Sequence, residues 1–242
     1  MVKNFAHRGY RARYPENTML AFQKAIEAGC DGIELDVQRS KDGSVVIMHD
    51  ERVDRTTDGA GFVRDMTLAE LRALDAGQGE RIPLLDEYFD LVAPLPLITN
   101  IEMKNSEIPY DGMEKQVIAM VRERRLDDRI IFSSFKHDSA ILCKQTAPGI
   151  PCGLLCKIHE LLPPNAPKVF ARMRDHRIDY IHPDVSSLNF ALLEALTQEG
   201  IPVNVWTVNA PAVLKRLLAE PCVHGVITDD PALLAGILNG GA

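Results

Sequence analysis

Two acidic residues, Glu34 and Asp36, lie two positions apart in an apolar segment that covers residues 32–37. In an extended strand, side chains two residues apart point to the same side and lie about 7 Å apart. Buried carboxylates lose solvation and repel each other, and a cation between them relieves both costs. The intervening apolar residues indicate that the other side of the strand is buried too, as in a parallel sheet covered by helices. We therefore expect a metal site here rather than a pair of exposed acids.

Glu102 is a third candidate metal ligand, in a predicted strand over residues 97–104 that also carries Lys104. Together with Glu34 and Asp36 it offers only oxygen ligands, and such a set favours Mg²⁺ or Ca²⁺ over zinc. We expect one divalent cation, with water and substrate in its remaining coordination positions.

The cations and histidines near these acids indicate phosphoryl chemistry. Arg8 and Lys104 would repel a nearby metal ion unless an anion lay between them. Histidines beside a metal of this type more often transfer protons than bind it, so His7 and His49 are the candidate acid and base. One histidine would activate the nucleophile and the other would protonate the leaving alkoxide; the sequence does not assign the two roles. Trp206 offers an apolar wall for a small polyol, although its spacing suits a core tryptophan equally well.

A turn signal, Lys41-Asp42-Gly43, separates the strand of Glu34 and Asp36 from a second extended run over residues 45–50. Because the connection is short, we expect the second run to be antiparallel to the first. Counting outward from the turn places His49 near Asp36. A hairpin therefore brings the histidine back to the carboxylates.

The rest of the chain alternates between predicted strands and helices. Apart from the return strand of the hairpin there are eight strands, each followed by a helix, and the length is close to the ~250 residues typical of a (β/α)8 TIM barrel. In such a barrel the chemistry gathers at the C-terminal ends of the strands. The alternation breaks from residue 51 to about 82, which we expect to be an insertion on the main fold. We expect strands over 3–7, 32–37, 97–104, 130–134, 152–156, 179–182, 203–207 and 225–228.

Composition narrows the class of protein. The 242 residues are 46% hydrophobic and 25% charged, as in globular proteins, and we expect one domain over residues 1–242. The net charge of −7 argues against nucleic acid or an anionic membrane as the main partner, but it allows a small anionic substrate. The oligomeric state, monomer or homodimer, stays open.

The cysteines and the hydropathy of the chain predict the cellular compartment of the protein. The five cysteines form no CxxC pair, so we expect reduced thiols rather than a metal site or disulfides. The first residues lack the apolar run of a signal peptide, and no stretch approaches 18 consecutive apolar residues. We expect a cytoplasmic protein with no stable membrane association.

An ordered set of short motifs resembles the glycerophosphodiester phosphodiesterase family, in particular its cytosolic bacterial members. The resemblance covers residues 3 to about 232, and any single motif would be weak evidence. The motifs are His7-Arg8-Gly9, Pro15-Glu16-Asn17-Thr18, Glu34-Leu35-Asp36-Val37, Lys41-Asp42-Gly43, His49-Asp50, Thr56 with Gly59 and Gly61, Ile101-Glu102-Met103-Lys104, Trp206-Thr207-Val208-Asn209 and Thr228-Asp229-Asp230-Pro231.

The resemblance implies a TIM barrel with a small insertion after the His49 strand, at about 51–95. It implies that this barrel uses a divalent metal to hydrolyse glycerophosphodiesters, such as glycerophosphocholine, to glycerol 3-phosphate and an alcohol. It also implies the role of each matching position. The metal ligands are Glu34, Asp36 and Glu102, the acid and base are His7 and His49, phosphate is held by Arg8 and Lys104, and Trp206 lines the glycerol side.

Two other functions remain as alternatives. A related barrel could act on lysophospholipids or release a cyclic phosphate, with a glycerol hydroxyl in place of water as nucleophile. The absence of an exposed basic amphipathic helix from the sequence pattern disfavours a lipid substrate. A non-catalytic barrel that binds metal or phosphate is disfavoured because no candidate histidine or carboxylate is missing.

The remaining polar residues have structural explanations. Asn17 or Thr18 can cap a helix, and Asp229 and Asp230 are expected to cap the last one. Asp50 is expected to be a supporting or turn residue. His182 and Asp184 either touch the alcohol group of the substrate or belong to a capped loop, and four histidines are expected at the surface: His137, His159, His176 and His224.

Overall fold

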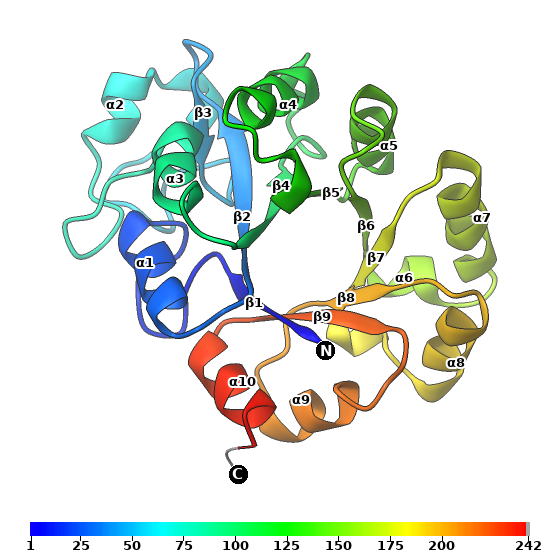
Figure 1. Cartoon of the computed structure of the whole chain (residues 1–242). Coiled ribbons are helices and arrows are strands. Elements are labelled where there is room, and N and C mark those ends of the chain that lie inside the picture. The colour runs from blue at the N-terminus through cyan, green and yellow to red at the C-terminus, as the bar shows by residue number, and fades with distance from the viewer. Residues whose placement is uncertain (241–242) are drawn as a thin grey trace.

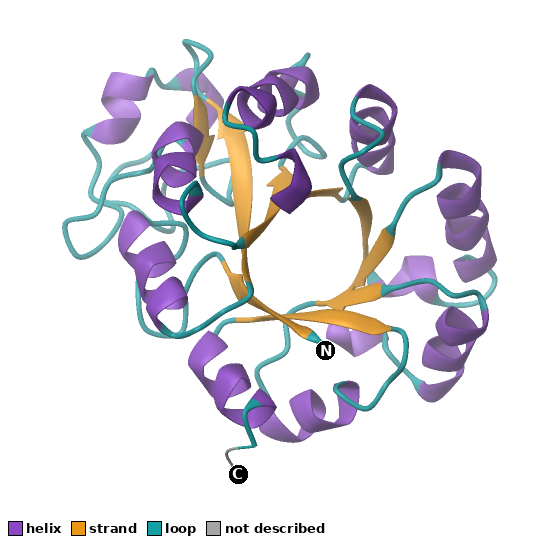
Figure 2. Cartoon of the chain, viewed as in Figure 1, coloured by secondary structure: helices purple, strands orange, loops and turns teal. Residues whose placement is uncertain are grey.

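The computed structural model describes residues 1–240. Within this range, eight parallel strands close into a barrel, and helices surround it (Figures 1 and 2). Closure is complete because β1 pairs with both β2 and β9. The predicted (β/α)8 architecture is therefore confirmed. The barrel strands are β1 (Lys3–His7), β2 (Gly32–Arg39), β4 (Ile98–Met103), β5 (Ile130–Ser134), β6 (Cys152–Cys156), β7 (Tyr180–Pro183), β8 (Val203–Val205) and β9 (Val223–Thr228).

The helices of the outer ring bury apolar side chains against the barrel, and α1, α8 and α10 begin at residues whose side chains cap them. Thr18 caps the first of them by accepting a hydrogen bond from the backbone N–H of Ala21 (3.2 Å). None of the described helices is long and apolar enough to cross a membrane. The ring consists of α1 (Met19–Glu27), α3 (Leu85–Val92), α4 (Met113–Glu123), α5 (His137–Thr146), α7 (Ala166–His176), α8 (Phe190–Gln198), α9 (Pro211–Leu217) and α10 (Pro231–Leu238).

The predicted hairpin is confirmed by β3 (Val45–Ile47), which pairs antiparallel with the end of β2. The backbone N–H of Met48 donates to the carbonyl oxygen of Asp36 (3.0 Å). The side-chain amide of Gln38 then donates to the carbonyl oxygens of residues 48–50 at 2.5–3.1 Å. This contact fixes the chain after β3, so that His49 returns to the carboxylates of β2.

Between β3 and α3 the chain leaves the barrel and forms η1 (Val63–Asp65) and α2 (Leu68–Arg72). This segment has a small hydrophobic core of its own, which includes Val53 and Leu71. A capping box starts this helix: Thr67 caps α2, and the Glu70 carboxylate accepts from the backbone N–H of Thr67 (2.7 Å). The helix ends at Arg72 after five residues.

The interior of the barrel is closed below the strand ends by apolar side chains. Phe5, Ile131 and Ile227 form a buried cluster there, and Phe5 lies two residues before His7 on the same face of β1. The Phe5 ring fits between Gly32 and Gly225, where an added Cβ atom would lie 2.6 Å from a ring atom in either case. Apolar packing thus supports the polar residues at the C-terminal ends from beneath.

Gly9 connects the end of β1 to the loop before α1, and its φ of 80° places it in the left-handed region. An added Cβ would lie 2.7–2.8 Å from three atoms of Ala21 in α1, two of them backbone atoms. Gly29 has nearly the same φ, 79°, but an added Cβ there meets nothing within 4 Å. A comparison of substitutions at the two glycines therefore separates the cost of left-handed backbone from the cost of a steric clash.

We expect Gly29→Ala to lower the free energy of unfolding by about 1 kcal/mol, the cost of left-handed backbone. Gly9→Ala should lower it by about 2–4 kcal/mol, because overpacking adds about 1–3 kcal/mol. Urea unfolding of both variants measures the difference. Equal losses of unfolding free energy in the two variants would show that α1 can shift away from the new Cβ atom of residue 9 at no cost in stability.

Candidate active site

The end of β1 places His7 and Arg8 at the mouth of the barrel. Arg8 has a φ of 55°, in the left-handed region that side chains rarely adopt. In this conformation its backbone N–H donates to both the carbonyl oxygen of Glu34 (2.8 Å) and the Oε2 atom of Glu34 (3.1 Å). The Arg8 Nε atom lies 3.4 Å from the Oδ2 atom of Asp36. The strained turn therefore brings a cation against two of the candidate metal ligands.

The three predicted metal ligands lie together. Glu34, Asp36 and Glu102 are buried, and each offers an oxygen atom within 4.8 Å of the others. Asn17 donates to Asp36 Oδ2 (2.9 Å), but Asp36 Oδ1 is buried and has no hydrogen-bond partner. Lys104 Nζ donates to Glu102 Oε1 (2.9 Å). An unpartnered carboxylate oxygen inside an all-oxygen cluster fits a hard divalent cation such as Mg²⁺ or Ca²⁺.

The electrostatics of this cluster also fit a cation. Burial raises the pKa of Glu34 well above its usual value, and the charges of Asp36 and Glu102 add to the effect. Burial likewise raises the pKa of Glu102 to about 7, although Lys104 opposes the shift. For Asp36, Arg8 and other cations outweigh burial and lower the pKa. Both raised pKa values have the same cause: buried carboxylates lie close together with too little positive charge around them.

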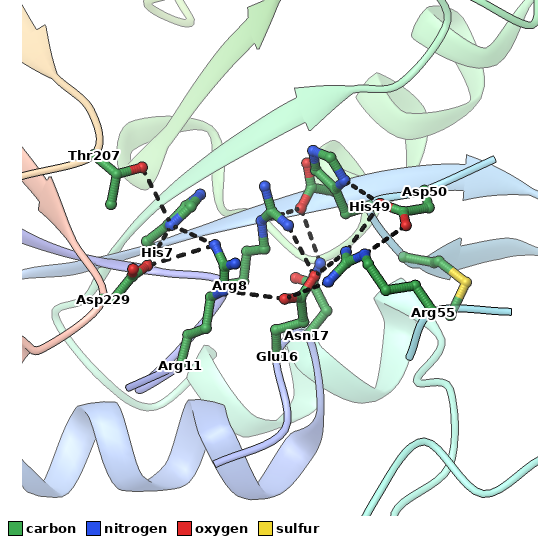
Figure 3. Close-up of polar contacts among 12 residues, drawn as sticks. His7, Arg8, Arg11, Glu16, Asn17, His49, Asp50, Arg55, Thr207 and Asp229 are labelled. Carbon is green, nitrogen blue, oxygen red and sulfur yellow. Dashed lines mark hydrogen bonds and ion pairs between the residues drawn. The ribbon is translucent and has the colours of Figure 1, made fainter. Parts of the chain in front are cut away.

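Both candidate acid–base residues are backed by a carboxylate. His7 Nδ1 lies 2.6 Å from the Oδ1 atom of Asp229, and His49 Nδ1 lies 2.6 Å from the Oδ1 atom of Asp50 (Figure 3). Because an ionised carboxylate only accepts hydrogen bonds, each Nδ1 atom donates, and each Nε2 atom is left for a substrate. Burial lowers the pKa of both histidines, while the partner carboxylates oppose this shift.

The prediction that Asp229 caps the last helix was wrong. Asp230 alone caps α10, by accepting from the backbone N–H of Leu233 (3.0 Å). Asp229 instead binds His7, and Asn209 holds its other oxygen (2.7 Å). The period of two along the strand could have found this residue, because Ile227 lines the cavity and side chains two apart share a face. Similarly, Asn17 binds Asp36, and only Thr18 caps α1.

A cavity of about 100 Å³ joins these groups at the C-terminal end of the barrel. Trp206 lines it half-buried and forms a T-shaped pair with Phe135 at a centroid distance of 5.5 Å. It also packs against the apolar cluster of the barrel interior, so it contacts both the cavity and the core. A larger, open groove of about 720 Å³ lies at the opposite end of β8 and β9, away from the carboxylates. The cavity is lined by His7, Arg8, Glu34, His49, Asn100, Glu102, Phe135, Leu155, Trp206 and Ile227.

Several predicted polar residues lie elsewhere. His182 is completely buried, with Nε2 at 2.9 Å from the amide of Asn204, and Asp184 caps η3 (Val185–Ser187). The expectation of a capped loop is therefore confirmed for Asp184. His159 and His176 are exposed as expected. The other two histidines are half-buried instead: His137 Nε2 lies 3.0 Å from a backbone carbonyl oxygen, and His224 Nδ1 lies 2.9 Å from Asn204 Oδ1.

Glu34, Glu102, Arg8 and both histidines line one small cavity. Asp36 and Lys104 do not line it themselves; Asp36 lies in the acidic cluster with the two glutamates, and Lys104 binds Glu102. This combination can neutralise a phosphodiester, take a proton from a nucleophile and give a proton to a leaving group. The arrangement is that of a hydrolytic site for an anionic substrate.

Comparisons with known proteins agree with this chemistry. A phosphodiesterase of Oleispira antarctica, solved in complex with the product sn-glycerol-3-phosphate, is 28% identical, with a TM-score of 0.83 over 97% of this chain and 96% of that one. The Thermotoga maritima glycerophosphodiester phosphodiesterase is 33% identical, with a TM-score of 0.80 and 98% of each chain covered.

Comparison of the amino-acid sequence identifies the protein family. The chain is 40% identical over 243 residues to a glycerophosphodiester phosphodiesterase of Caldanaerobacter subterraneus subsp. tengcongensis, covering 98% of this chain and 97% of that protein. A model of the glycerophosphoryl diester phosphodiesterase family matches residues 7–233. The chain therefore belongs to the glycerophosphoryl diester phosphodiesterase family of enzymes.

Proposed function

We propose that the protein hydrolyses glycerophosphodiesters, such as glycerophosphocholine or glycerophosphoethanolamine, to sn-glycerol 3-phosphate and an alcohol, using a divalent metal and two histidines. The observation that carries the proposal is the cavity lined by two carboxylates of the acidic cluster, Glu34 and Glu102, together with two carboxylate-backed histidines. The product bound to the Oleispira antarctica relative supports the substrate class.

Glu34, Asp36 and Glu102 would hold one Mg²⁺ or Ca²⁺ ion, whose charge would stabilise a phosphoryl group. Arg8 and Lys104 bind phosphoryl oxygens from the side of these carboxylates. Arg8 is paired with Asp36 and Lys104 with Glu102. These contacts fix the orientation of both cations before the phosphate group of the substrate binds.

His7 and His49 act as acid and base through their Nε2 atoms. One takes a proton from the nucleophile, and the other gives a proton to the oxygen of the leaving alcohol. The nucleophile is water or the substrate's own glycerol hydroxyl; in the second case a cyclic phosphate forms first, and the same histidines serve both routes. Trp206 lines the cavity opposite the acids and holds the carbon face of the glycerol.

The organisation of the molecule is part of the proposal. We propose one domain over residues 1–242, of which 241–242 lie outside the described residues, with an insertion at about 51–95. A cytoplasmic location is supported by five free cysteines, four of them buried. The substrate is a small molecule, and the net charge of −7 disfavours nucleic acid as a partner. The protein is a monomer or a homodimer.

Glu34→Gln should abolish the rise in melting temperature that Ca²⁺ or Mg²⁺ gives to the wild type and should lower activity at least about 100-fold, because a ligand and a charge are lost. Thermal unfolding with each metal and with chelator measures this. The matched control is Glu114→Gln, because Glu114 is also buried but binds Asn105 and Ser139 (2.6 and 2.7 Å). A metal response that survives in Glu34→Gln would remove Glu34 from the site.

The same experiment has a pH dependence. Because the pKa of Glu102 is raised to about 7, the metal-free folded protein binds protons that the unfolded chain releases near its ordinary pKa of 4.5. The contribution of Glu102 to the stability of the metal-free protein should therefore decline as pH rises from 4.5 through 7. The stabilisation by metal should be larger at pH 8 than at pH 5, since protons no longer compete for the ligands.

His7→Ala and His49→Ala should each lower kcat for glycerophosphocholine at least about 100-fold, the ordinary contribution of general acid–base catalysis, and should keep the metal response. A phosphodiester with a nitrophenol leaving group needs no acid, so it should restore only the variant that lacks the acid. Assays of released glycerol 3-phosphate and nitrophenol measure both effects. His176→Ala is the control, since His176 is exposed. Wild-type kcat in either histidine variant would contradict its role.

A lysophospholipid substrate is a second candidate, and one observation favours it. Among the described residues, the large apolar side chains that are exposed include Ile158, Leu162 and Phe190, all in segments that follow β6 or β7. These segments leave from the C-terminal ends of the strands, the end that carries the cavity. Exposed apolar side chains of this kind can contact a lipid surface.

On this second candidate, Phe190→Ser should lower turnover of lysophosphatidylcholine micelles at least about tenfold, since Phe190 is 73% exposed and its ring would insert in lipid. Turnover of glycerophosphocholine should not change. Choline release from both substrates measures the ratio. A wild type that releases no choline from the micelles would end this candidate.

A further inference from the structure

One carboxylate, that of Glu16, lies between the two histidine–aspartate pairs (Figure 3). Three arginines converge on it. Its Oε1 atom accepts from Arg8 (2.8 Å) and Arg55 (2.6 Å), and its Oε2 atom accepts from Arg55 (3.1 Å) and lies 3.0 Å from Arg11 Nε. The Glu16 side chain is only 9% exposed, so its charge depends on these cations more than on water.

The first connection leads from Glu16 to His49. While one edge of the Arg55 guanidinium binds Glu16, its Nε atom donates to Asp50 Oδ2 (2.6 Å) and its Nη2 atom to Asp50 Oδ1 (2.9 Å). Asp50 Oδ1 is the oxygen that lies 2.6 Å from His49 Nδ1. A two-point contact between planar groups fixes orientation as well as distance, so Arg55 sets the plane of the Asp50 carboxylate.

The second connection leads from Glu16 to His7 and is looser. Arg11 binds Glu16 through Nε, and its Nη1 atom lies 3.7 Å from Asp229 Oδ1 and 3.4 Å from His7 Nδ1. Asp229 also has a separate hydrogen bond from Asn209 (2.7 Å). His7 therefore has support that does not pass through Glu16, whereas Asp50 is held from the side of Glu16.

Glu16 itself does not line the cavity that holds the histidines and the metal ligands. Its loop is nonetheless tied to the site, because the next residue, Asn17, binds Asp36 and the one after it, Thr18, caps α1. Arg55 comes from the segment between β3 and α3 that leaves the barrel. The ion pairs of Glu16 thus join the loop after β1 to that segment at the point where both reach the histidines.

We propose that Glu16 is a positioning residue for both histidines, acting on His49 through Arg55 and Asp50 and, more weakly, on His7 through Arg11 and Asp229. The inference rests on the proposed acid–base function of the histidines. Glu16 binds no substrate; it holds each aspartate so that the imidazole keeps its proton on Nδ1 and presents Nε2 to the cavity.

Glu16→Gln should lower kcat for glycerophosphocholine about 10- to 100-fold, the usual cost of a small misplacement of catalytic groups. Arg55→Met should lower kcat comparably and leave KM unchanged, because Arg55 does not line the cavity. Arg55→Lys should restore part of the loss. Since both residues act on His49 by one route, the double variant Glu16→Gln/Arg55→Met should lose much less than the product of the single losses.

A spectroscopic measurement separates positioning from general loosening. Nitrogen NMR of the imidazoles, with His49→Ala for assignment, should show His49 protonated on Nδ1 in wild type and a shift toward Nε2 in Glu16→Gln and Arg55→Met. The matched control is Asp54→Asn, which breaks the exposed ion pair of Asp54 with Arg52 (2.8 Å) in the same segment. This control should keep both kcat and the tautomer.

The outcomes are distinct. Wild-type kcat and tautomer in Glu16→Gln, or losses in the double variant that simply multiply, would overturn the inference. If Glu16→Gln does not fold, the two Arg55 variants decide the same question through kcat and the His49 tautomer. His7→Ala and His49→Ala are measured in parallel: full activity there would overturn the proposed function instead, whereas inactivity there together with an active Glu16→Gln would overturn only the positioning by Glu16.

Discussion

The mutual repulsion of three buried carboxylates is the constraint on which the rest of this structure depends. Neighbouring parallel strands bring Asp36 beside Glu102 in register, and Glu34 points to the same interior. Closing the barrel therefore concentrates negative charge where water is scarce, which is costly unless positive charge is supplied. Arg8 and Lys104 supply part of it, and a divalent cation fits the remainder. The same deficit makes the cavity receptive to a metal and, through the metal, to a phosphate.

From this cluster outward the charges alternate in sign. Arg8 lies outside the metal ligands, Glu16 outside Arg8, and further arginines and aspartates follow until the two histidines are reached (Figure 3). The members come from the loop after β1, the hairpin, the segment after β3 and the end of β9. No segment can complete the pattern alone, so the site exists only once the barrel has closed. Closure of the barrel and formation of the site therefore occur together.

The sequence predicted the parts of the molecule that repeat or have local signals. Strands such as 130–134 and 152–156 have apolar runs of the right length, and the turn Lys41-Asp42-Gly43 led to the correct return of His49. The partner of His7 was missed because Asp229 and Asp230 are equally good caps by type, and only the orientation of a strand 222 residues away separates them. Arg55 gave no signal at all, since it lies in irregular chain whose path is set by tertiary contacts.

The Phe5 ring, which lies between two glycines beneath the site, limits how molecules can enter and leave the cavity. Because Phe5, Ile131 and Ile227 fill the barrel below the carboxylates, the cavity is closed at its inner end and opens only at the C-terminal ends of the strands. Substrate would enter by the same mouth through which both products of the proposed hydrolysis would leave. Kinetically, the phosphate product would then compete directly with substrate, and its departure would clear the cavity for the next turnover.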